Sequence, residues 1–146
     1  MSMATNKWLE RLLAGVDPGI YVAPPEPDRF SLDDAIAERG WRCHGGSVGS
    51  AGDKATLLEA LGEILDAPTD WGRNWDALVD VARSLPPGER TIVVLDDVGG
   101  PAKSCPNDWA TAVDILATTT EEAAATGDHL VVILRSSDPH SGYLAL

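Results

Sequence analysis

The sequence predicts an α/β fold, in which a small three-stranded parallel sheet is packed with helices and follows a helical and extended N-terminal arm. Residues 91–95 and 130–134 are apolar or β-branched throughout, which is typical of strands covered on both faces. Helical patterns of apolar residues stand before and between these two segments. Because parallel strands need long crossovers, usually helices, this order predicts right-handed connections between parallel strands.

The N-terminal arm holds two short helical patterns separated by a proline-rich stretch. Residues 5–14 place apolar side chains on one side of a helix, whereas residues 15–30 contain four prolines and are expected to be extended or loop-like. Ser31 is suited to cap a second helix over residues 31–39. We expect this arm to be a lid, a packing segment or a partly mobile extension.

The main domain is expected to begin with a weak strand over residues 41–48, which two glycines interrupt. A helix that starts at Ser50 or Asp53 follows, and Pro68 ends it. The apolar stripe of this helix comprises Leu57, Leu58, Leu61, Ile64 and Leu65.

Two more helices complete the prediction. The segment 71–85 is helical and is closed by the turn at residues 86–88, Pro-Pro-Gly. Asn107 or Asp108 caps a long helix that precedes the last strand, and Gly127 ends it.

Length and composition fit one main domain with a sizeable core. The chain has 146 residues, of which 44 % are hydrophobic and 23 % are charged. We divide it into an N-terminal extension over residues 1–40, the domain over residues 41–136 and a C-terminal tail over residues 137–146.

The formal net charge of −12 is high for a chain of this size. It argues against nucleic acid as a partner, because phosphates require clustered cations, and against an anionic membrane surface. It favours salt-sensitive association with a basic protein. Solubility alone explains the same charge, so both interpretations stay open at this point.

The cysteine content and the N-terminus favour a cytoplasmic protein. Cys43 and Cys105 are too few for a disulfide scaffold, and their spacing fits no zinc site. We expect reduced thiols, although a single long-range disulfide stays open. Charges interrupt the apolar residues near the N-terminus, and no apolar run reaches the length of a membrane span, so no signal peptide or membrane helix is predicted.

No catalytic motif stands out in the chain. Cys43 and His44 are neighbours on a predicted strand, so their side chains point to opposite faces. Asp96 and Asp97 follow a strand and could hold Mg²⁺, but a solvated turn explains them equally simply. The glycine-containing stretch 99–104 lacks the spacing of a phosphate-binding loop. We therefore expect no enzyme, no metal site and no cofactor, with a metal-dependent enzyme as a lesser alternative.

The most informative stretch is residues 68–80, a tight loop that leads into a helix. Asp76 and Asp80 project together from this helix because they are four residues apart. Like charges at that spacing destabilise a helix by about 0.2–0.5 kcal/mol, so the fold alone does not require them. A surface that binds a strongly basic partner, in contrast, requires such paired carboxylates. Trp71, beside Gly72, is expected to be an exposed anchor.

Residues 70–80, Asp-Trp-Gly-Arg-Asn-Trp-Asp-Ala-Leu-Val-Asp, resemble the signature of the barstar family. That signature is an aromatic-Gly-x-Asn-x-Asp-Ala-Leu-x-Asp run after a helix and a proline-bearing turn. The resemblance extends over about residues 41–136, where helices and strands fall in the family's order. It implies an intracellular, non-catalytic inhibitor that blocks a secreted guanyl-preferring ribonuclease with an acidic helix and loop.

The resemblance also implies roles for individual residues. Asp80 matches the carboxylate that enters the cationic phosphate site of the nuclease, and Asp76 matches the acidic residue that meets a nuclease arginine. Gly72 and Asn74 match loop residues that set the shape of the loop and offer hydrogen bonds.

Other positions match less completely. Trp71 and Asp70 stand where the family has two aromatic residues, so Asp70 departs from the pattern. Arg83 stands where a small polar residue is usual, and Val79 replaces an aromatic residue. Glu122 matches an acidic contact on the long helix.

The expected partner is therefore a basic extracellular-type ribonuclease, held in a one-to-one complex by carboxylates that take the place of RNA phosphates. An immunity protein against another cationic nuclease toxin, such as a DNase, would use the same acidic face and is the main alternative. Because Asp70 and Val79 depart from the family pattern, a different basic protein also stays open as the partner.

Overall fold

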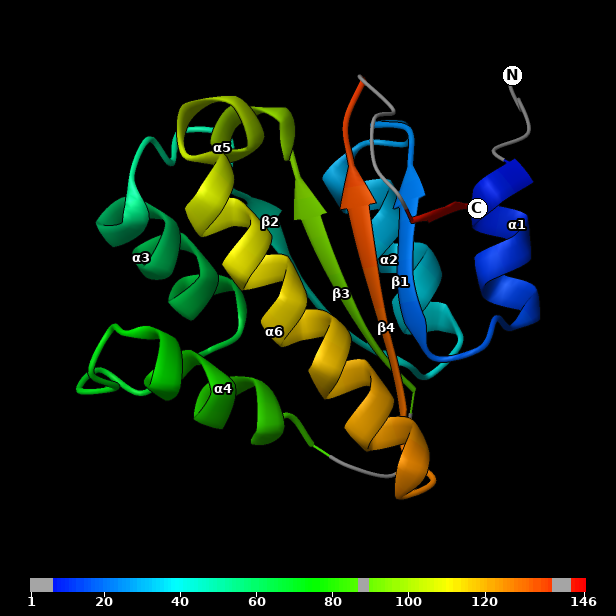
Figure 1. Ribbon diagram of the computed structural model, residues 1–146. Coiled ribbons are helices and arrows are strands. Elements are labelled where there is room, and N and C mark those ends of the chain that lie inside the picture. The colour runs from blue at the N-terminus through cyan, green and yellow to red at the C-terminus, as the bar shows by residue number, and fades with distance from the viewer. Residues whose placement is uncertain (1–6, 87–89, 138–142) are drawn as a thin grey trace.

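A computed structural model describes residues 7–86, 90–137 and 143–146 (Figure 1). The strands are β1 (Gly19–Ala23), β2 (Arg42–Ser47), β3 (Arg90–Asp96), β4 (His129–Arg135) and β5 (Leu144–Ala145). The helices are α1 (Lys7–Ala14), α2 (Arg29–Glu38), α3 (Lys54–Ile64), α4 (Trp75–Arg83), α5 (Gly99–Ser104) and α6 (Pro106–Ala125). Part of the predicted Pro-Pro-Gly turn and much of the predicted tail lie outside the described residues.

The sheet is parallel, as predicted, but it is larger than the three strands expected. Its order is β2-β3-β4-β1-β5, with four full strands and the two-residue β5. The additional full strand, β1, comes from the stretch predicted to be extended or loop-like, and it pairs with β4 over five residues. Pro18 and Pro24 flank this strand without interrupting it, and the Ile-Tyr-Val run between them favours β structure.

Helices cover both faces of the sheet. Figure 1 shows α3, α4 and α6 on one face and α1 and α2 on the other. The side chains of β3 alternate between the two cores. Val93 and Leu95 pack with the α3, α4 and α6 side, and Ile92 and Val94 pack with the arm. Both faces are therefore buried, as the uninterrupted apolar strands predicted.

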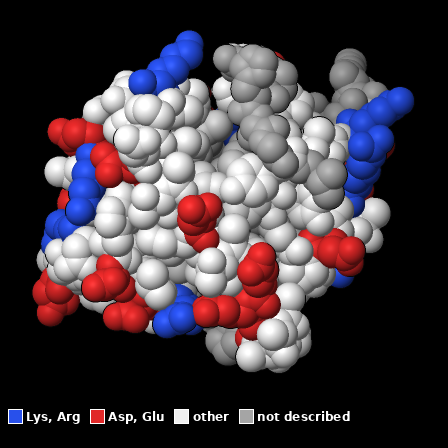
Figure 2. All heavy atoms as spheres, viewed as in Figure 1, with Lys and Arg blue, Asp and Glu red and all other residues white. Residues whose placement is uncertain are grey.

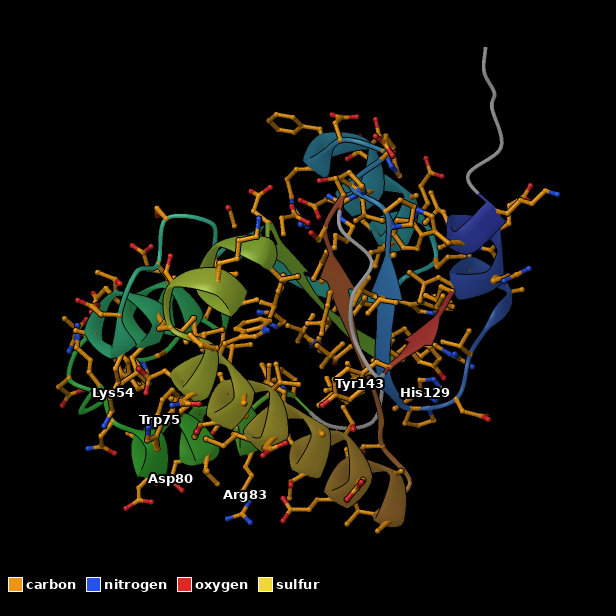
Figure 3. The ribbon with its side chains drawn as sticks, turned by 45° about the horizontal axis from the view of Figure 1, so that its top comes forward. Lys54, Trp75, Asp80, Arg83, His129 and Tyr143 are labelled. Atoms are coloured by element: carbon orange, nitrogen blue, oxygen red, sulfur yellow. The ribbon has the colours of Figure 1, made fainter. Side chains whose placement is uncertain are left out.

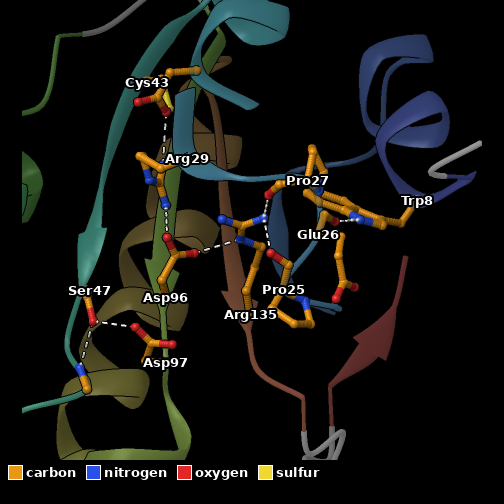
Figure 4. Close-up of polar contacts among 12 residues, drawn as sticks. Trp8, Pro25, Glu26, Pro27, Arg29, Cys43, Ser47, Asp96, Asp97 and Arg135 are labelled. Carbon is orange, nitrogen blue, oxygen red and sulfur yellow. Dashed lines mark hydrogen bonds and ion pairs between the residues drawn. The ribbon is translucent and has the colours of Figure 1, made fainter. Parts of the chain in front are cut away.

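A buried arginine joins the arm to the sheet. The Arg135 side chain is only 3 % exposed, and its Nε donates to a carboxylate oxygen of Asp96 at 2.6 Å (Figure 4). Its Nη1 donates to the carbonyl oxygens of Pro25 and Pro27 at 3.1 and 2.6 Å. Asp96 also pairs with Arg29 at the start of α2. This network ties the arm to the carboxyl ends of β3 and β4.

The helix limits are partly as predicted. Asp53 caps α3, since its side chain accepts from the backbone N–H of Thr56 at 2.9 Å. The helix predicted over residues 71–85 begins only at Trp75, and α6 begins with Pro106 rather than after Asn107 or Asp108. The short α5 was not expected. In the part of the chain that the structure describes, no helix combines the length and apolar character needed to cross a membrane.

Candidate protein-binding face

The loop before α4 turns sharply because two consecutive residues have positive φ. Gly72 has φ +88° and Arg73 has φ +49°. Glycine adopts this region freely, whereas an arginine there needs support. The structure supplies that support, because Nε of Arg73 donates to Glu59 at 2.7 Å and Nη1 donates to the carbonyl of Thr69 at 3.1 Å. The loop is thus fixed to α3 before α4 begins.

Asn74 starts α4. Its extended backbone precedes the helix, and its side-chain oxygen accepts from the backbone N–H of Ala77 at 2.8 Å. This is a helix cap, which stabilises a helix by about 1 kcal/mol. Asp76 follows in the first turn, where a negative charge complements the helix dipole. Asn74 is therefore part of the local framework that orients the acidic residues.

Trp71 is less exposed than the sequence predicted for an anchor. It is half-buried and packs at the edge of the core beneath α3. Its indole ring lies directly on Gly62, where a Cβ atom would fall 2.7 Å from Cζ2 of the ring. Only a residue without a side chain leaves room for this contact. Trp71 thus fixes the loop to α3 and keeps part of its ring at the surface.

Helix α4 separates an apolar face from an acidic one. Leu78, Val81 and Ala82 are buried against the core, whereas Asp76 and Asp80 are exposed and lie one turn apart. Figure 3 shows Asp80 pointing away from the body of the protein. The two carboxylates therefore face solvent from a helix that its cap and its core contacts hold in place.

Arg83 and Glu122 form an ion pair that the sequence did not predict. Nε and Nη2 of Arg83 donate to the two carboxylate oxygens of Glu122 at 2.9 and 2.8 Å, which links the end of α4 to α6. These hydrogen bonds hold the pKa of Glu122 below its ordinary value and raise the pKa of Arg83. The structure thus pairs two residues that the resemblance treats as separate partner contacts.

A groove of about 520 Å³ runs beside α4 toward the edge strand β2. Trp71 of the loop and Asp80 of α4 line it, together with Arg42 and His44 of β2. His44 Nδ1 stands 3.4 Å from a carboxylate oxygen of Asp66. The surface next to Asp80 is therefore concave.

Acidic side chains gather around this part of the molecule. Figure 2 shows Asp and Glu side chains over α4 and the neighbouring end of α6, with a few cationic side chains among them. Asp70 and Gly72 are also exposed in the loop. Six of the eight predicted contact residues form one continuous stretch from the loop through α4: Asp70, Trp71, Gly72, Asn74, Asp76 and Asp80. Arg83 and Glu122 lie at its far end.

The other acidic candidates from the sequence, Asp96 and Asp97, have hydrogen-bond donors of their own. Both carboxylate oxygens of Asp96 accept from arginines, and Asp97 accepts from the Ser47 hydroxyl at 2.6 Å. Among the described residues, no group of three or more His, Cys, Asp or Glu is placed to hold a metal ion. The two cysteines are free thiols, and burial raises the pKa of Cys43 to about 12.

Comparison with known proteins identifies one family. A family model described as "Barstar (barnase inhibitor)" matches residues 47–135, which is more than half of the chain. The match runs from the end of β2 to the end of β4, so it includes the loop, α4 and α6 and leaves α1, β1 and α2 outside. No curated protein matches the chain.

Proposed function

This chain belongs to the barstar family of barnase inhibitors, and from that premise we propose that it inhibits a secreted, guanyl-preferring ribonuclease in the cytoplasm. It does so without catalysis, by covering the active site of one enzyme molecule with the loop at residues 70–74 and with helix α4. The observation that carries the proposal is the pair of exposed carboxylates, Asp76 and Asp80, on a helix whose start is fixed by a cap.

The physical basis is the charge of a ribonuclease cleft. An enzyme that binds RNA must surround the phosphates with arginine, lysine or histidine side chains. Burying such cations beneath another protein without anionic partners costs several kcal/mol each. A carboxylate delivered where a phosphate would lie restores charge-assisted hydrogen bonds and excludes the substrate. Asp80 serves at the phosphate position, and Asp76 meets an arginine one turn away.

The remaining loop residues contribute shape. Gly72 permits the sharp turn, and Asn74 fixes the direction of α4. Trp71 presents the uncovered part of its ring beside the acidic residues, where an aromatic side chain gives contact area at low entropic cost. Asp70 adds a third carboxylate to the loop in place of an aromatic residue.

The experiment is an inhibition assay on single-stranded RNA with barnase as the probe nuclease. We expect the wild type to inhibit barnase. Asp80→Asn should raise the inhibition constant by more than about a hundredfold, because an unpaired charge buried in the complex weakens the free energy of binding by about 3 kcal/mol. Asp76→Asn should have a smaller effect, and Glu122→Gln the smallest. Inhibition should weaken as salt rises past the level at which the screening length is about 8 Å.

The matched control is Asp34→Asn, which removes one exposed negative charge from α2, on the opposite face of the sheet. It should leave inhibition within about twofold of the wild type. If Asp80→Asn and Asp34→Asn have equal effects, the acidic helix is not the contact. A DNase arm in the same assay separates the nuclease classes, and inhibition of a cationic DNase alone would contradict the ribonuclease proposal.

A further inference from the structure

The pair formed by Arg83 and Glu122 is unusual for a surface that is meant to receive cations. Its two hydrogen bonds are parallel and occupy both oxygens of the carboxylate. The side chains are 55 % and 44 % exposed, so the pair lies open to solvent at the rim where α4 meets α6. Figure 3 shows Arg83 pointing outward from α4. This bidentate geometry is the strongest form of an Arg–carboxylate contact.

The pair changes the charge that a partner meets. In the described part of the chain, neither Asp76 nor Asp80 has a cationic side chain within ion-pair distance, whereas Glu122 is already neutralised by Arg83. Arg83 has five N–H donors, and the two hydrogen bonds to Glu122 use two of them. The pair therefore carries no net charge, and three N–H donors of Arg83 are not used by Glu122, although the resemblance implies an acidic contact there.

We propose that Arg83 withholds Glu122 from the partner and thereby selects among ribonucleases. The inference rests on the proposed function and concerns the chemistry of the enzyme that is captured. An enzyme with an arginine or lysine opposite this rim is disfavoured, because that cation meets Arg83. An enzyme with a carbonyl or carboxylate acceptor there is favoured, because it receives the remaining guanidinium N–H groups.

Competition for Glu122 favours Arg83 over an incoming cation. Both partners of the existing pair belong to one folded chain, so the pair forms without loss of translational freedom. A nuclease arginine would have to break two charge-assisted hydrogen bonds and leave the Arg83 guanidinium beside its own charge. The hydrogen bonds to Glu122, and to a smaller extent the charge of Asp80, raise the pKa of Arg83.

The test measures inhibition of barnase, a basic nuclease, by the wild type, Arg83→Gln, the double variant Arg83→Gln/Glu122→Gln and the control Arg39→Gln. The control removes one exposed positive charge at the end of α2, away from α4. We expect Arg83→Gln to lower the inhibition constant about tenfold and the double variant to lose that gain. The control should stay within about twofold of the wild type.

Several outcomes would overturn the inference. Unchanged or weaker inhibition by Arg83→Gln would show that Glu122 is not being withheld. Retention of the full gain by the double variant would show the same. If none of the proteins inhibits barnase, the proposed function fails together with this inference. If the wild type inhibits and Arg83→Gln makes no difference, only the inference fails.

A second measurement needs no nuclease. The pKa of the Glu122 carboxyl group, followed by NMR, should lie below the ordinary value of 4.5 in the wild type and return to it in Arg83→Gln. Equal values in the two proteins would show that the pair does not persist in solution, which also overturns the inference.

Discussion

Replacing Asp96 with asparagine should remove a large part of the stability of this protein. The Asp96 carboxylate accepts from Nε of Arg135 at 2.6 Å and also pairs with Arg29. Asparagine has nearly the same shape but no charge, and its NH₂ group cannot accept from a guanidinium. The substitution therefore leaves the guanidinium of Arg135, whose side chain is 3 % exposed, without a charge partner.

The expected size of the effect follows from this burial. Removing one partner of a buried ion pair costs about 3–5 kcal/mol, because an uncompensated charge stays in the interior. The carbonyl oxygens of Pro25 and Pro27 still accept from Arg135, so the lower end of that range applies. We expect the free energy of unfolding to fall by about 3 kcal/mol, which lowers Tm by on the order of 10 °C in a domain of this size.

Urea denaturation followed by tryptophan fluorescence and circular dichroism measures this loss. The control is Asp97→Asn, which removes the same charge from the next residue. Asp97 is exposed and has φ +60°, a conformation that asparagine tolerates well, so the control should cost less than about 1 kcal/mol. A loss below about 1 kcal/mol for Asp96→Asn would refute the claim that this network anchors the arm.

Two further predictions concern Gly62 and Cys43. Alanine at Gly62 would favour the helix by about 1 kcal/mol if space allowed, but its Cβ would meet the Trp71 ring. We therefore expect Gly62→Ala to lower the free energy of unfolding by about 1–3 kcal/mol and to change the tryptophan emission spectrum. A stabilised variant would contradict this packing. Because the pKa of Cys43 is about 12 and thus above its unfolded value of 9.0, its thiolate fraction at pH 8 should be about a thousandfold below that of an ordinary thiol, and alkylation should be correspondingly slow. The free energy of unfolding should fall as pH rises above 9, and the fall should be smaller in Cys43→Ala; equal pH slopes in the two proteins would contradict this.

The elements that the sequence predicted correctly are those with strong local signals. The uninterrupted apolar runs identified β3 and β4, and Asp53, one of the two predicted start residues, caps α3. Strand β1 was missed because the prolines on either side dominate its local composition, and only pairing with β4 stabilises its extended backbone. Local composition cannot show which strand a short segment will join.

The candidate protein-binding face likewise has features that the sequence predicted and features that it did not. Spacing alone placed Asp76 and Asp80 on one side of α4, because both belong to a single helix. The pairing of Arg83 with Glu122 joins residues 39 positions apart, and so does the pairing of Asp96 with Arg135. Neither has a signal in a single sequence, since each depends on how two elements meet in the fold. Trp71 was expected at the surface because it stands beside Gly72 in a loop, and its contact with Gly62 of α3 is likewise tertiary.

The N-terminal arm leaves the acidic side chains of α4 uncovered. Helices α1 and α2 lie on the opposite side of the sheet from α4, so they do not cover Asp76 or Asp80 (Figure 1). Their apolar side chains instead bury Ile92 and Val94 of β3 on the face that α4 leaves uncovered. The arm thus contributes to stability, whereas in the proposed function α4 and its loop make the contact with the nuclease. We therefore expect Asp96→Asn, tested at a temperature where it is folded, to inhibit a ribonuclease as well as the wild type does. Weaker inhibition by the folded variant would show that the two sides of the sheet are coupled.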